Sequence, residues 1–212
     1  RVAPRIRLED QAIEALKRCE IPIYEPGLES LVRKNMKEHR LSFTTDLRPA
    51  SRAARAVFIA VGTPSRADGA ADLPFVPQVA ASIGDNLNGY KVIVTKSTVP
   101  TGTGKVIEGI VRERAGDDAE FGVVSNPEFL REGSAIEDFM RPNRVVVGSR
   151  DQRAIDIMLD IYSPLNRAKV PFVIADVETA ELIKYASNAF LATKITFINE
   201  VGELGERTRA ET

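Results

Sequence analysis

The sequence predicts an α/β fold: a doubly wound, Rossmann-like, mostly parallel sheet followed by one long helix. Short, continuously apolar runs recur along the chain, as strands that are buried on both faces require. Amphipathic stretches separate these runs, and regular alternation of strand and helix favours a parallel sheet with helices on both faces. From Val177 onward, roughly thirty residues contain neither Pro nor a turn cluster, which predicts the long helix.

The elements follow one another in a regular order. The predicted strands are Ala56–Val61, Val92–Val94, Phe121–Val124, Val145–Val147 and Phe172–Ala175. The helices between them are expected near Phe75–Leu87, Gly104–Arg114 and Gln152–Tyr162. Ligands of such a sheet bind beyond the carboxyl ends of its strands. The residues that follow each strand are therefore the first candidates for a functional site.

Composition excludes some classes of function. A chain of 212 residues with 43% hydrophobic content can bury a sizeable core. Its 29 basic and 30 acidic residues give a net charge of -1, which does not suit a nucleic-acid binder. No apolar run approaches the roughly 20 residues of a membrane span, so a cytoplasmic location is expected. The single Cys19 cannot form an internal disulfide, which fits a reducing compartment.

The long helix has recognisable signals at its start and along its length. Asp176 is the expected N-cap, and Glu178 and Glu181 would lie near the positive end of the helix. At about 1.5 Å per residue the helix would be roughly 45 Å long, more than one small domain covers. We interpret it as a connecting helix that packs against a second subunit, the alternative being an ordinary core helix. Its apolar stripe comprises Ile183, Ala186, Phe190, Thr193, Phe197, Val201 and Leu204.

Two loops after strands carry hydroxyl groups. In the segment at 61–64, Gly62 would let a ligand approach the backbone and Thr63 offers a hydroxyl, although a plain turn fits these residues equally. The segment at 96–105 ends like a phosphate loop, but a Walker motif would need Gly at Val99 and Ser or Thr at Val106. A GxGxxG pattern also fails there. A hydroxyl-rich loop with Thr98 near the strand end remains.

The segment NPEFLREG at 126–133 follows the third strand. Pro127 restrains Asn126 to an extended conformation. Glu128 and Glu132 are four residues apart, so on a helical turn they would face the same way. Such a pair could divide the roles of base and ligand anchor, because like charges and partial burial separate pKa values. A solvated acidic helix start is the alternative.

Lys184 and Asn188 are also four residues apart and would share one face of the long helix. A lysine in a site can stabilise the oxygen charge that develops when an alcohol is oxidised, while an amide fixes substrate or water. The alternative is that both side chains face solvent.

Taken together, these segments resemble the UDP-glucose 6-dehydrogenase family, one of the nucleotide-sugar dehydrogenases of the UDP-glucose/GDP-mannose type. The resemblance covers nearly the whole chain in order. It rests on IPIYEPGL at 21–28, TTDL at 44–47, FIAVGTP at 58–64, KSTVPTGT at 96–103, NPEFLREG at 126–133, PNRVVVG at 142–148 and ELIKYASNAFLATKITFINE at 181–200.

The resemblance implies a function. Members of this family oxidise the C6 alcohol of UDP-glucose to the carboxylate of UDP-glucuronate, using two NAD and passing through a cysteine-bound thiohemiacetal and thioester. It further implies a homodimer built on the long helix and no metal. The NAD-binding domain would comprise residues 1–175, and residues 176–212 would start the dimerisation domain.

The resemblance also implies roles for individual residues. Thr63 and Thr98 would contact NAD, Thr98 also holding a catalytic water, and Glu128 would serve the water that hydrolyses the thioester. Lys184 would stabilise oxyanions and Asn188 would bind the sugar or water. The substrate site would also be lined by Glu128, Phe129, Leu130, Arg131 and Glu132, with Glu132 near the nicotinamide.

The sequence departs from the family at both ends. Family members begin with a strand and a GxGYVG loop that seats the pyrophosphate, and this sequence starts after them. Arg7 and Ala12 stand where an Asp that holds the ribose and a Lys are usual. The nucleophilic cysteine would lie beyond Thr212. Cys19 is expected to be an incidental thiol, and His39 a surface residue.

The 212-residue chain alone is therefore expected to be inactive. Three alternatives remain for the parent protein: a GDP-mannose or UDP-amino-sugar dehydrogenase, a single-step hydroxyacid dehydrogenase, and a non-catalytic assembly protein.

Overall fold

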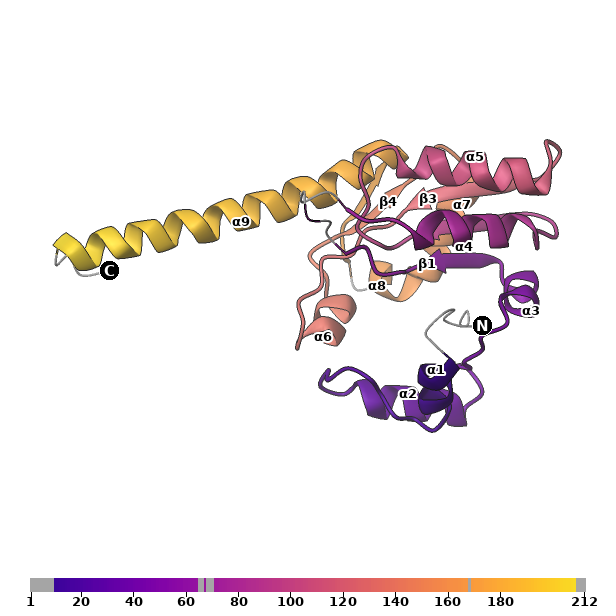
Figure 1. Ribbon diagram of the computed structural model, residues 1–212, viewed down its shortest axis with the longest axis horizontal. Helices are drawn as coiled ribbons and strands as arrows, with labels where there is room; N and C mark the ends of the chain where they lie inside the picture. Colours follow the sequence, from indigo (N-terminus) through magenta and orange to yellow (C-terminus); the bar gives the residue numbers. More distant parts are fainter. Residues whose placement is uncertain (1–9, 65–66, 68–70, 168, 209–212) are drawn as a thin grey trace.

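A five-stranded sheet forms the centre of the molecule (Figure 1). The computed structural model describes residues 10–64, 67, 71–167 and 169–208. Each predicted strand is present, and the strands lie side by side in chain order. They are β1 (Ala56–Ile59), β2 (Lys91–Thr95), β3 (Phe121–Ser125), β4 (Val145–Gly148) and β5 (Phe172–Ala175). The predicted strands and their alternation with helices are confirmed.

The sheet is mostly parallel, as predicted. Strands β1, β2 and β3 run parallel to one another, and β4 runs parallel to β5. Only the junction between β3 and β4 is antiparallel, through the pair Ser125 and Gly148. The carboxyl ends of β1, β2 and β3 therefore meet at one edge of the sheet.

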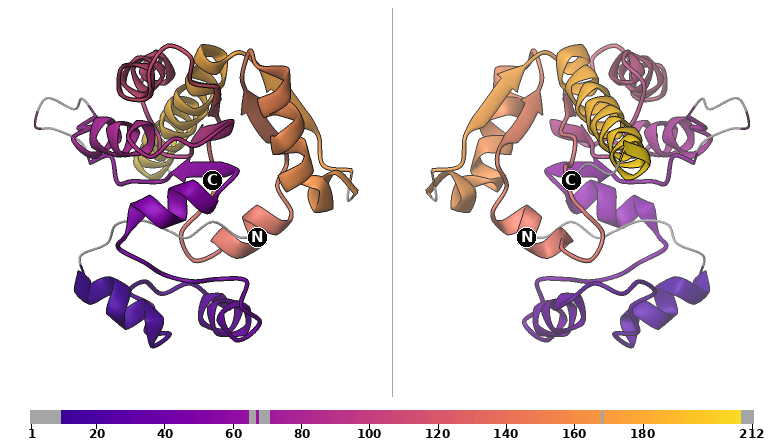
Figure 2. Two further views of the ribbon diagram at one scale, coloured as in Figure 1. Left: turned by 90° about the vertical axis from the view of Figure 1, so that its right-hand side faces the viewer. Right: turned by 90° about the vertical axis from the view of Figure 1, so that its left-hand side faces the viewer.

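Helices cover both faces of the sheet, which makes the fold doubly wound (Figure 2). Helices α4 (Phe75–Gly84) and α5 (Thr103–Ala115) cover one face, and α7 (Gln152–Ile161) and α8 (Ser163–Arg167) cover the other. Along β2, Val92 and Val94 pack toward α7 and α8, while Ile93 packs toward α4 and α5. This alternation explains why the central strands are apolar without interruption: every position of β2 and β4 is buried on one face or the other, whereas Val173 and Ile174 of the edge strand β5 are exposed.

Three helices precede the sheet: α1 (Asp10–Lys17), α2 (Leu28–Lys37) and α3 (Leu47–Ala53). They lie on the side of the molecule where β1 forms the edge (Figure 1). Ala12 lies in α1, whereas Arg7 lies outside the described residues. Cys19 and His39 follow α1 and α2 with φ of 62° and 55°. Both occupy the left-handed position that often ends a helix and is usually Gly, and His39 is exposed as expected.

Two segments far apart in sequence meet at α6 (Ala135–Met140). The carboxylate of Glu25 accepts hydrogen bonds from the backbone N–H groups of Gly133 at 2.9 Å and Ile136 at 3.4 Å. The segment IPIYEPGL is thereby joined to the end of NPEFLREG.

Helix α9 (Val177–Thr208) is 32 residues long and extends away from the sheet (Figure 1). Asp176 caps it as predicted, since its Oδ1 accepts a 2.8 Å hydrogen bond from Thr179 N. Its first turn packs so closely that a Cβ on Gly104 would lie 2.3 Å from Val177 Cγ1, and a Cβ on Gly148 would lie 2.4 Å from Ala180 Cβ. Glycine is thus required on α5 and β4 for α9 to approach.

In the part of the chain that the structure describes, no helix is long and apolar enough to cross a membrane. Among the same residues, no group of three or more His, Cys, Asp or Glu side chains could hold a metal ion.

Candidate active site

The loops after β1 and β2 lie next to each other at the carboxyl edge of the sheet. Ser97 Oγ donates a 2.7 Å hydrogen bond to the carbonyl of Val61, and the N–H of Lys96 donates to the carbonyl of Ile59 at 2.8 Å. These bonds place the two hydroxyl residues Thr63 and Thr98 on neighbouring loops, both half-buried. Both loops therefore border the region beyond the carboxyl ends of the strands, which is called the crevice below.

Lys184 of α9 is joined to Glu128 in the loop after β3. The Lys184 side chain is only 8% exposed, and its Nζ lies 3.0 Å from Glu128 Oε1. The same ammonium group donates to the backbone carbonyl of Glu128 at 2.5 Å. A solvent-facing lysine, the alternative considered from the sequence, is excluded. The helix thus brings one cation to one carboxylate at the crevice.

Glu181, one turn before Lys184, contacts a different helix from the one expected. Its carboxylate accepts hydrogen bonds from the backbone N–H groups of Gly102 at 2.6 Å and Gly104 at 2.8 Å. The prediction that Glu181 serves the positive end of its own helix is wrong, because the free N–H groups at the start of α5 lie within reach. Burial raises the pKa of Glu181, and the two N–H donors oppose that rise.

The segment NPEFLREG does not start a helix at Glu128, so the expected pairing of two carboxylates on one face is wrong. Residues 126–131 are irregular, and α6 begins only at Ala135. Glu128 Oε2 accepts a 2.5 Å hydrogen bond from Leu130 N, which bends its side chain back onto its own loop. Glu132 is exposed, and Gly133 with φ of 82° turns the chain away. Glu128 alone faces Lys184.

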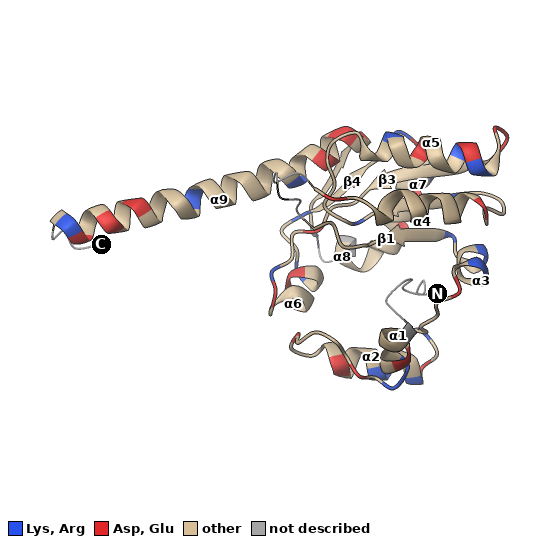
Figure 3. Ribbon diagram, viewed as in Figure 1, with Lys and Arg blue, Asp and Glu red and all other residues tan. Residues whose placement is uncertain are grey.

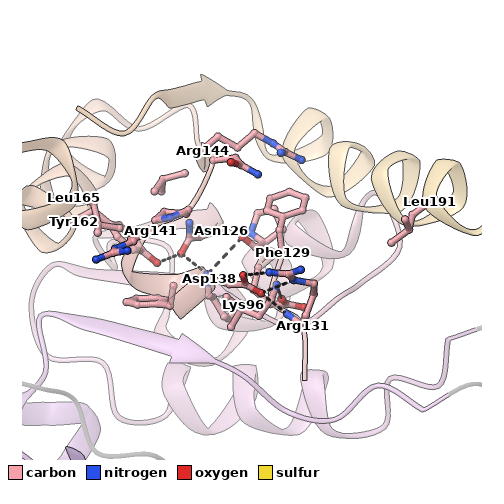
Figure 4. A pocket seen from close by; sticks show the side chains of 17 residues that line it. Lys96, Asn126, Phe129, Arg131, Asp138, Arg141, Arg144, Tyr162, Leu165 and Leu191 are labelled. Atoms are coloured by element: carbon pink, nitrogen blue, oxygen red, sulfur yellow. Dashed lines mark hydrogen bonds and ion pairs between the residues drawn. The ribbon is translucent and has the colours of Figure 1, made fainter. Parts of the chain in front are cut away.

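A pocket of about 420 Å³ opens beside this loop (Figure 4). Of the predicted substrate residues, Glu128, Phe129, Leu130 and Arg131 line it. Glu132 and Asn188 do not, and both are exposed. The other lining residues are Lys96, Asn126, Pro127, Asp138, Phe139, Arg141, Pro142, Asn143, Arg144, Val145, Tyr162, Leu165 and Leu191.

Sequence comparison agrees with this arrangement. Residues 5–166 match the model of the UDP-glucose/GDP-mannose dehydrogenase family, NAD binding domain. Residues 178–212 match the central domain of the same family. The chain belongs to the UDP-glucose/GDP-mannose dehydrogenase family. The UDP-glucose 6-dehydrogenase of Rhizobium meliloti is 54% identical over 205 residues, which are 95% of this chain and 47% of that protein. TuaD of Bacillus subtilis, also a UDP-glucose 6-dehydrogenase, is 50% identical over 96% of this chain and 44% of its own length.

Solved structures of family members superpose closely. A UDP-glucose dehydrogenase from Pyrobaculum islandicum superposes with a TM-score of 0.91 at 43% sequence identity. A GDP-mannose dehydrogenase from Pseudomonas aeruginosa superposes with a TM-score of 0.92 at 35% sequence identity. Each comparison covers 97% of this chain and 48% of the other. The chain thus spans about half the length of the relatives it matches.

The crevice has features that fit part of a family dinucleotide. A Cβ on Gly62 would meet no atom within 4 Å, so the backbone of that loop is open to a ligand. Thr63 and Thr98 supply hydroxyl groups beside it. The start of α5 is not a pyrophosphate site, because Glu181 already accepts from its N–H groups. The loop after β1 therefore leaves open backbone at the carboxyl edge of the sheet, in a domain that matches a family model for NAD binding.

A buried polar network beneath the pocket was not predicted from the sequence. Asn126 is 1% exposed, and its Oδ1 accepts from Tyr162 Oη at 2.6 Å and from Lys96 Nζ at 3.2 Å. Its Nδ2 donates to the carbonyl of Val146 at 2.7 Å. Burial lowers the pKa of Lys96 to about 8, although Glu128 acts to raise it. The position of Lys96 directly after β2 could have identified it, whereas nothing in the sequence links Tyr162 to Asn126.

Two arginines of the pocket are held in different ways. Arg131 donates to both oxygens of Asp138, at 2.8 Å and 3.1 Å, and these bonds lower the pKa of Asp138 to about 2. The guanidinium of Arg144 lies 4.1 Å from the centre of the Phe129 ring and donates to Ser187 Oγ at 3.3 Å. The ring of Phe129 also faces Lys184, at 5.2 Å. Phe129 is thus positioned between two cations.

Cys19 is not part of this site. It lies at the end of α1, where its Sγ is 3.6 Å from Met36 Sδ, and it does not line the pocket.

Proposed function

We propose that the complete protein oxidises the C6 alcohol of UDP-glucose to the carboxylate of UDP-glucuronate. In the balanced reaction, one alcohol, one water and two NAD⁺ give one carboxylate, two NADH and three protons. The observation that carries the proposal is the pair of Lys184 and Glu128 at the crevice, in a chain up to 54% identical to UDP-glucose 6-dehydrogenases. The domain boundary we propose separates an NAD-binding domain, residues 1–175, from the start of a dimerisation domain, residues 176–212.

The roles of the site residues follow from charge and position. Lys184 would stabilise negative charge on the substrate oxygen, because a nearly dry ammonium group interacts strongly with an oxyanion. Glu128 would accept a proton from the attacking water, which Thr98 would hold. Phe129, Leu130 and Arg131 would line the site that binds the nucleotide sugar. Asn188 and Glu132, which are exposed in the isolated chain, would contact it from the rim of the crevice.

Thr63 and Thr98, with the backbone at Gly62, would hold the nicotinamide end of the cofactor. Bound there, NAD would supply the hydride acceptor for both oxidations. We also propose a cytoplasmic location, which is supported by the single Cys19, since this chain cannot form an internal disulfide and suits a reducing compartment.

GDP-mannose is the competing substrate, because the GDP-mannose dehydrogenase structure superposes as closely as the UDP-glucose dehydrogenase. UDP-glucose is favoured because sequence identity is higher for UDP-glucose dehydrogenases, 43% against 35%. The test is NADH formation by the complete protein with each nucleotide sugar. We expect two NADH per UDP-glucose, whereas turnover of GDP-mannose alone would refute the choice of substrate. One NADH per substrate would indicate a single-step alcohol dehydrogenase.

Site variants test the residue roles in the complete protein. Lys184→Met and Glu128→Gln should each lower kcat by at least about a hundredfold. Lys194→Met is a matched control, because Lys194 lies on the same helix but is exposed. Activity in either site variant equal to that of the control would contradict the assigned roles.

We further propose that α9 packs against α9 of a second copy of this chain. Beyond its first turns the helix exposes large apolar side chains on several sides, among them Phe190 at 67% and Phe197 at 65%. The only charge between Lys184 and Glu200 is Lys194 (Figure 3). A helix that is apolar around much of its circumference is stable in water only when another surface covers it.

Analytical ultracentrifugation tests the dimer. Wild type should sediment as a dimer, and the double variant Phe197→Glu with Ile198→Glu as a monomer, because each carboxylate would be buried unpaired. The control Glu203→Gln, on an exposed position of the same helix, should remain dimeric. A monomeric wild type that retains its helix content would contradict the proposal.

A further inference from the structure

Two basic residues of the pocket, Lys96 and Arg144, form no ion pair among the residues that the structure describes, and Arg144 instead lies over the ring of Phe129. Lys184 pairs with Glu128 and Arg131 pairs with Asp138. Lys96 lines the same pocket, yet among the residues that the structure describes it forms no ion pair with any carboxylate. Its acceptors are neutral: Asn126 Oδ1 at 3.2 Å and the carbonyl of Pro127 at 3.5 Å.

These two contacts leave the ammonium group incompletely satisfied. An ammonium group has three N–H donors, and both contacts are longer than the usual 2.7–2.9 Å of charge-assisted hydrogen bonds. At least one donor therefore remains for another acceptor. Removing a cation from water without a counter-ion is costly, so an anion in the pocket would relieve that cost.

The position of Lys96 is fixed by its surroundings. Asn126, the main acceptor, is itself held by Tyr162 Oη and by the carbonyl of Val146. The ammonium group is therefore held at the floor of the pocket rather than extending freely from a surface (Figure 4). Such preorganisation reduces the entropy lost when a ligand binds.

The lining as a whole is positive. It contains four basic residues, Lys96, Arg131, Arg141 and Arg144, against two acidic ones, Glu128 and Asp138. The acidic side chains are already paired, with Lys184 and Arg131 respectively. The remaining titratable group that lines the pocket is Tyr162, whose pKa burial raises to about 12, so it stays neutral.

We propose that Lys96 binds an anionic oxygen of the nucleotide-sugar ligand, either of its diphosphate or of the carboxylate that oxidation creates. The identity of this ligand rests on the proposed function. The anion site itself follows from the pocket alone.

The first test is calorimetric titration of the 212-residue chain with UDP, UDP-glucose and UDP-glucuronate. Lys96→Met should weaken binding about ten- to a hundredfold for each ligand that carries the contacted anion. An equal loss of affinity for all three ligands would show that Lys96 binds the diphosphate. A loss of affinity for UDP-glucuronate alone would show that it binds the carboxylate. Lys105→Met, an exposed lysine at the start of α5, is the control. If Lys96→Met binds all three ligands with affinities within twofold of those of wild type, the inference is overturned.

The second test follows the ammonium group itself by NMR of lysine-labelled protein, with Lys96→Met identifying its signal. Pyrophosphate and D-glucuronate serve as probes that need no nucleotide. Either anion should raise the titration midpoint of Lys96 by stabilising its charged form, whereas a midpoint unchanged by both would overturn the inference.

The two hypotheses can fail separately. A chain that binds UDP, UDP-glucose and UDP-glucuronate equally well with and without Lys96 keeps the proposed function and loses the anion site. If pyrophosphate shifts the titration midpoint of Lys96 while no nucleotide sugar binds, the anion site is supported and the proposed ligand is refuted.

Discussion

Glu181 Oε1 accepts a 2.8 Å hydrogen bond from the backbone N–H of Gly104 and so joins the start of α9 to the start of α5. One turn later, Lys184 joins the same helix to the loop after β3. Helix α9 is therefore fixed to two of the loops that border the crevice. The position of the Lys184 ammonium group depends on both attachments.

Replacement of Glu181 by Gln should destabilise the protein by about 1–3 kcal/mol. Both carboxylate oxygens accept from backbone N–H groups, so the amide NH₂ of Gln would face a donor and leave one N–H unsatisfied. Urea denaturation measures the change. Glu203→Gln, on an exposed position of α9, should alter the free energy of unfolding by no more than about 0.5 kcal/mol. Equal stability of the two variants would show that the Glu181 bonds contribute nothing.

Replacement of Gly104 by Ala should destabilise the protein by about 1–3 kcal/mol through overpacking. The new methyl group would lie 2.3 Å from Val177 Cγ1. The second change Val177→Ala removes that atom and should restore part of the loss. Gly109→Ala is the control on the same helix, since its Cβ meets nothing within 4 Å, and it should stabilise by about 0.5–1 kcal/mol. Failure of Val177→Ala to rescue Gly104→Ala would exclude this contact as the cause.

The lowered pKa of Lys96 predicts that the free energy of unfolding changes at alkaline pH. Its pKa is lowered from 10.5 to about 8 by burial, so above pH 8 the folded state binds fewer protons than the unfolded state. Stability contributed by this group therefore rises as pH increases from 8 toward 10.5, with a slope of at most about 1.4 kcal/mol per pH unit. Comparing the free energies of unfolding of wild type and Lys96→Met between pH 7 and pH 10 isolates the effect. A constant difference over that range would be incompatible with the lowered pKa.

The lowered pKa of Asp138 predicts that the free energy of unfolding changes at acid pH. Hydrogen bonds from Arg131 lower its pKa from 3.8 to about 2, so its contribution is complete above pH 3.8 and is lost as pH falls toward 2. In Arg131→Met the Asp138 carboxyl group should titrate closer to 3.8, as measured by carbon-detected NMR. Arg141→Met, which removes a neighbouring exposed arginine that pairs with Glu137, should leave the titration of Asp138 unchanged. An unchanged Asp138 pKa in Arg131→Met would contradict the structure.

Cys19→Gly should stabilise the protein by about 1 kcal/mol. Cys19 has φ of 62°, a left-handed conformation that costs L-residues about 1–2 kcal/mol and glycine little, while the greater freedom of glycine in the unfolded chain offsets part of the gain. Ala15→Gly within α1, where the backbone is helical, should instead destabilise. Thermal unfolding distinguishes the two directions, and a loss of stability in Cys19→Gly would refute the prediction.

The central strands could be predicted because they are buried from both sides. Packing by α4 and α5 on one face and α7 and α8 on the other demands apolar residues at every position, and such runs are visible in a sequence. Boundaries were less accurate: β1 ends at Ile59, whereas the apolar run continues to Val61. The ladder with β2 ends there, since Ile59 pairs with Thr95, the last residue of β2.

The contacts within the site depend on pairs of residues far apart in the sequence. Lys184 and Glu128 are separated by 56 positions, and no local pattern connects them. Glu181 was assigned to the nearest helix end because sequence shows only near neighbours, while its true donors are 77 and 79 positions away. Lys96, Asn126 and Tyr162 meet for the same reason, through the packing of α7 against β3 and β4.

The length of α9 has a mechanical consequence. With 32 residues at about 1.5 Å each, the helix is about 48 Å long, and within this chain its contacts with the sheet lie near one end. A tilt of about 10° at the fastened turns would move the opposite tip by about 8 Å. Because of this length, a small change in the direction of α9 at the turn where Lys184 meets Glu128 would become a large displacement at its other end.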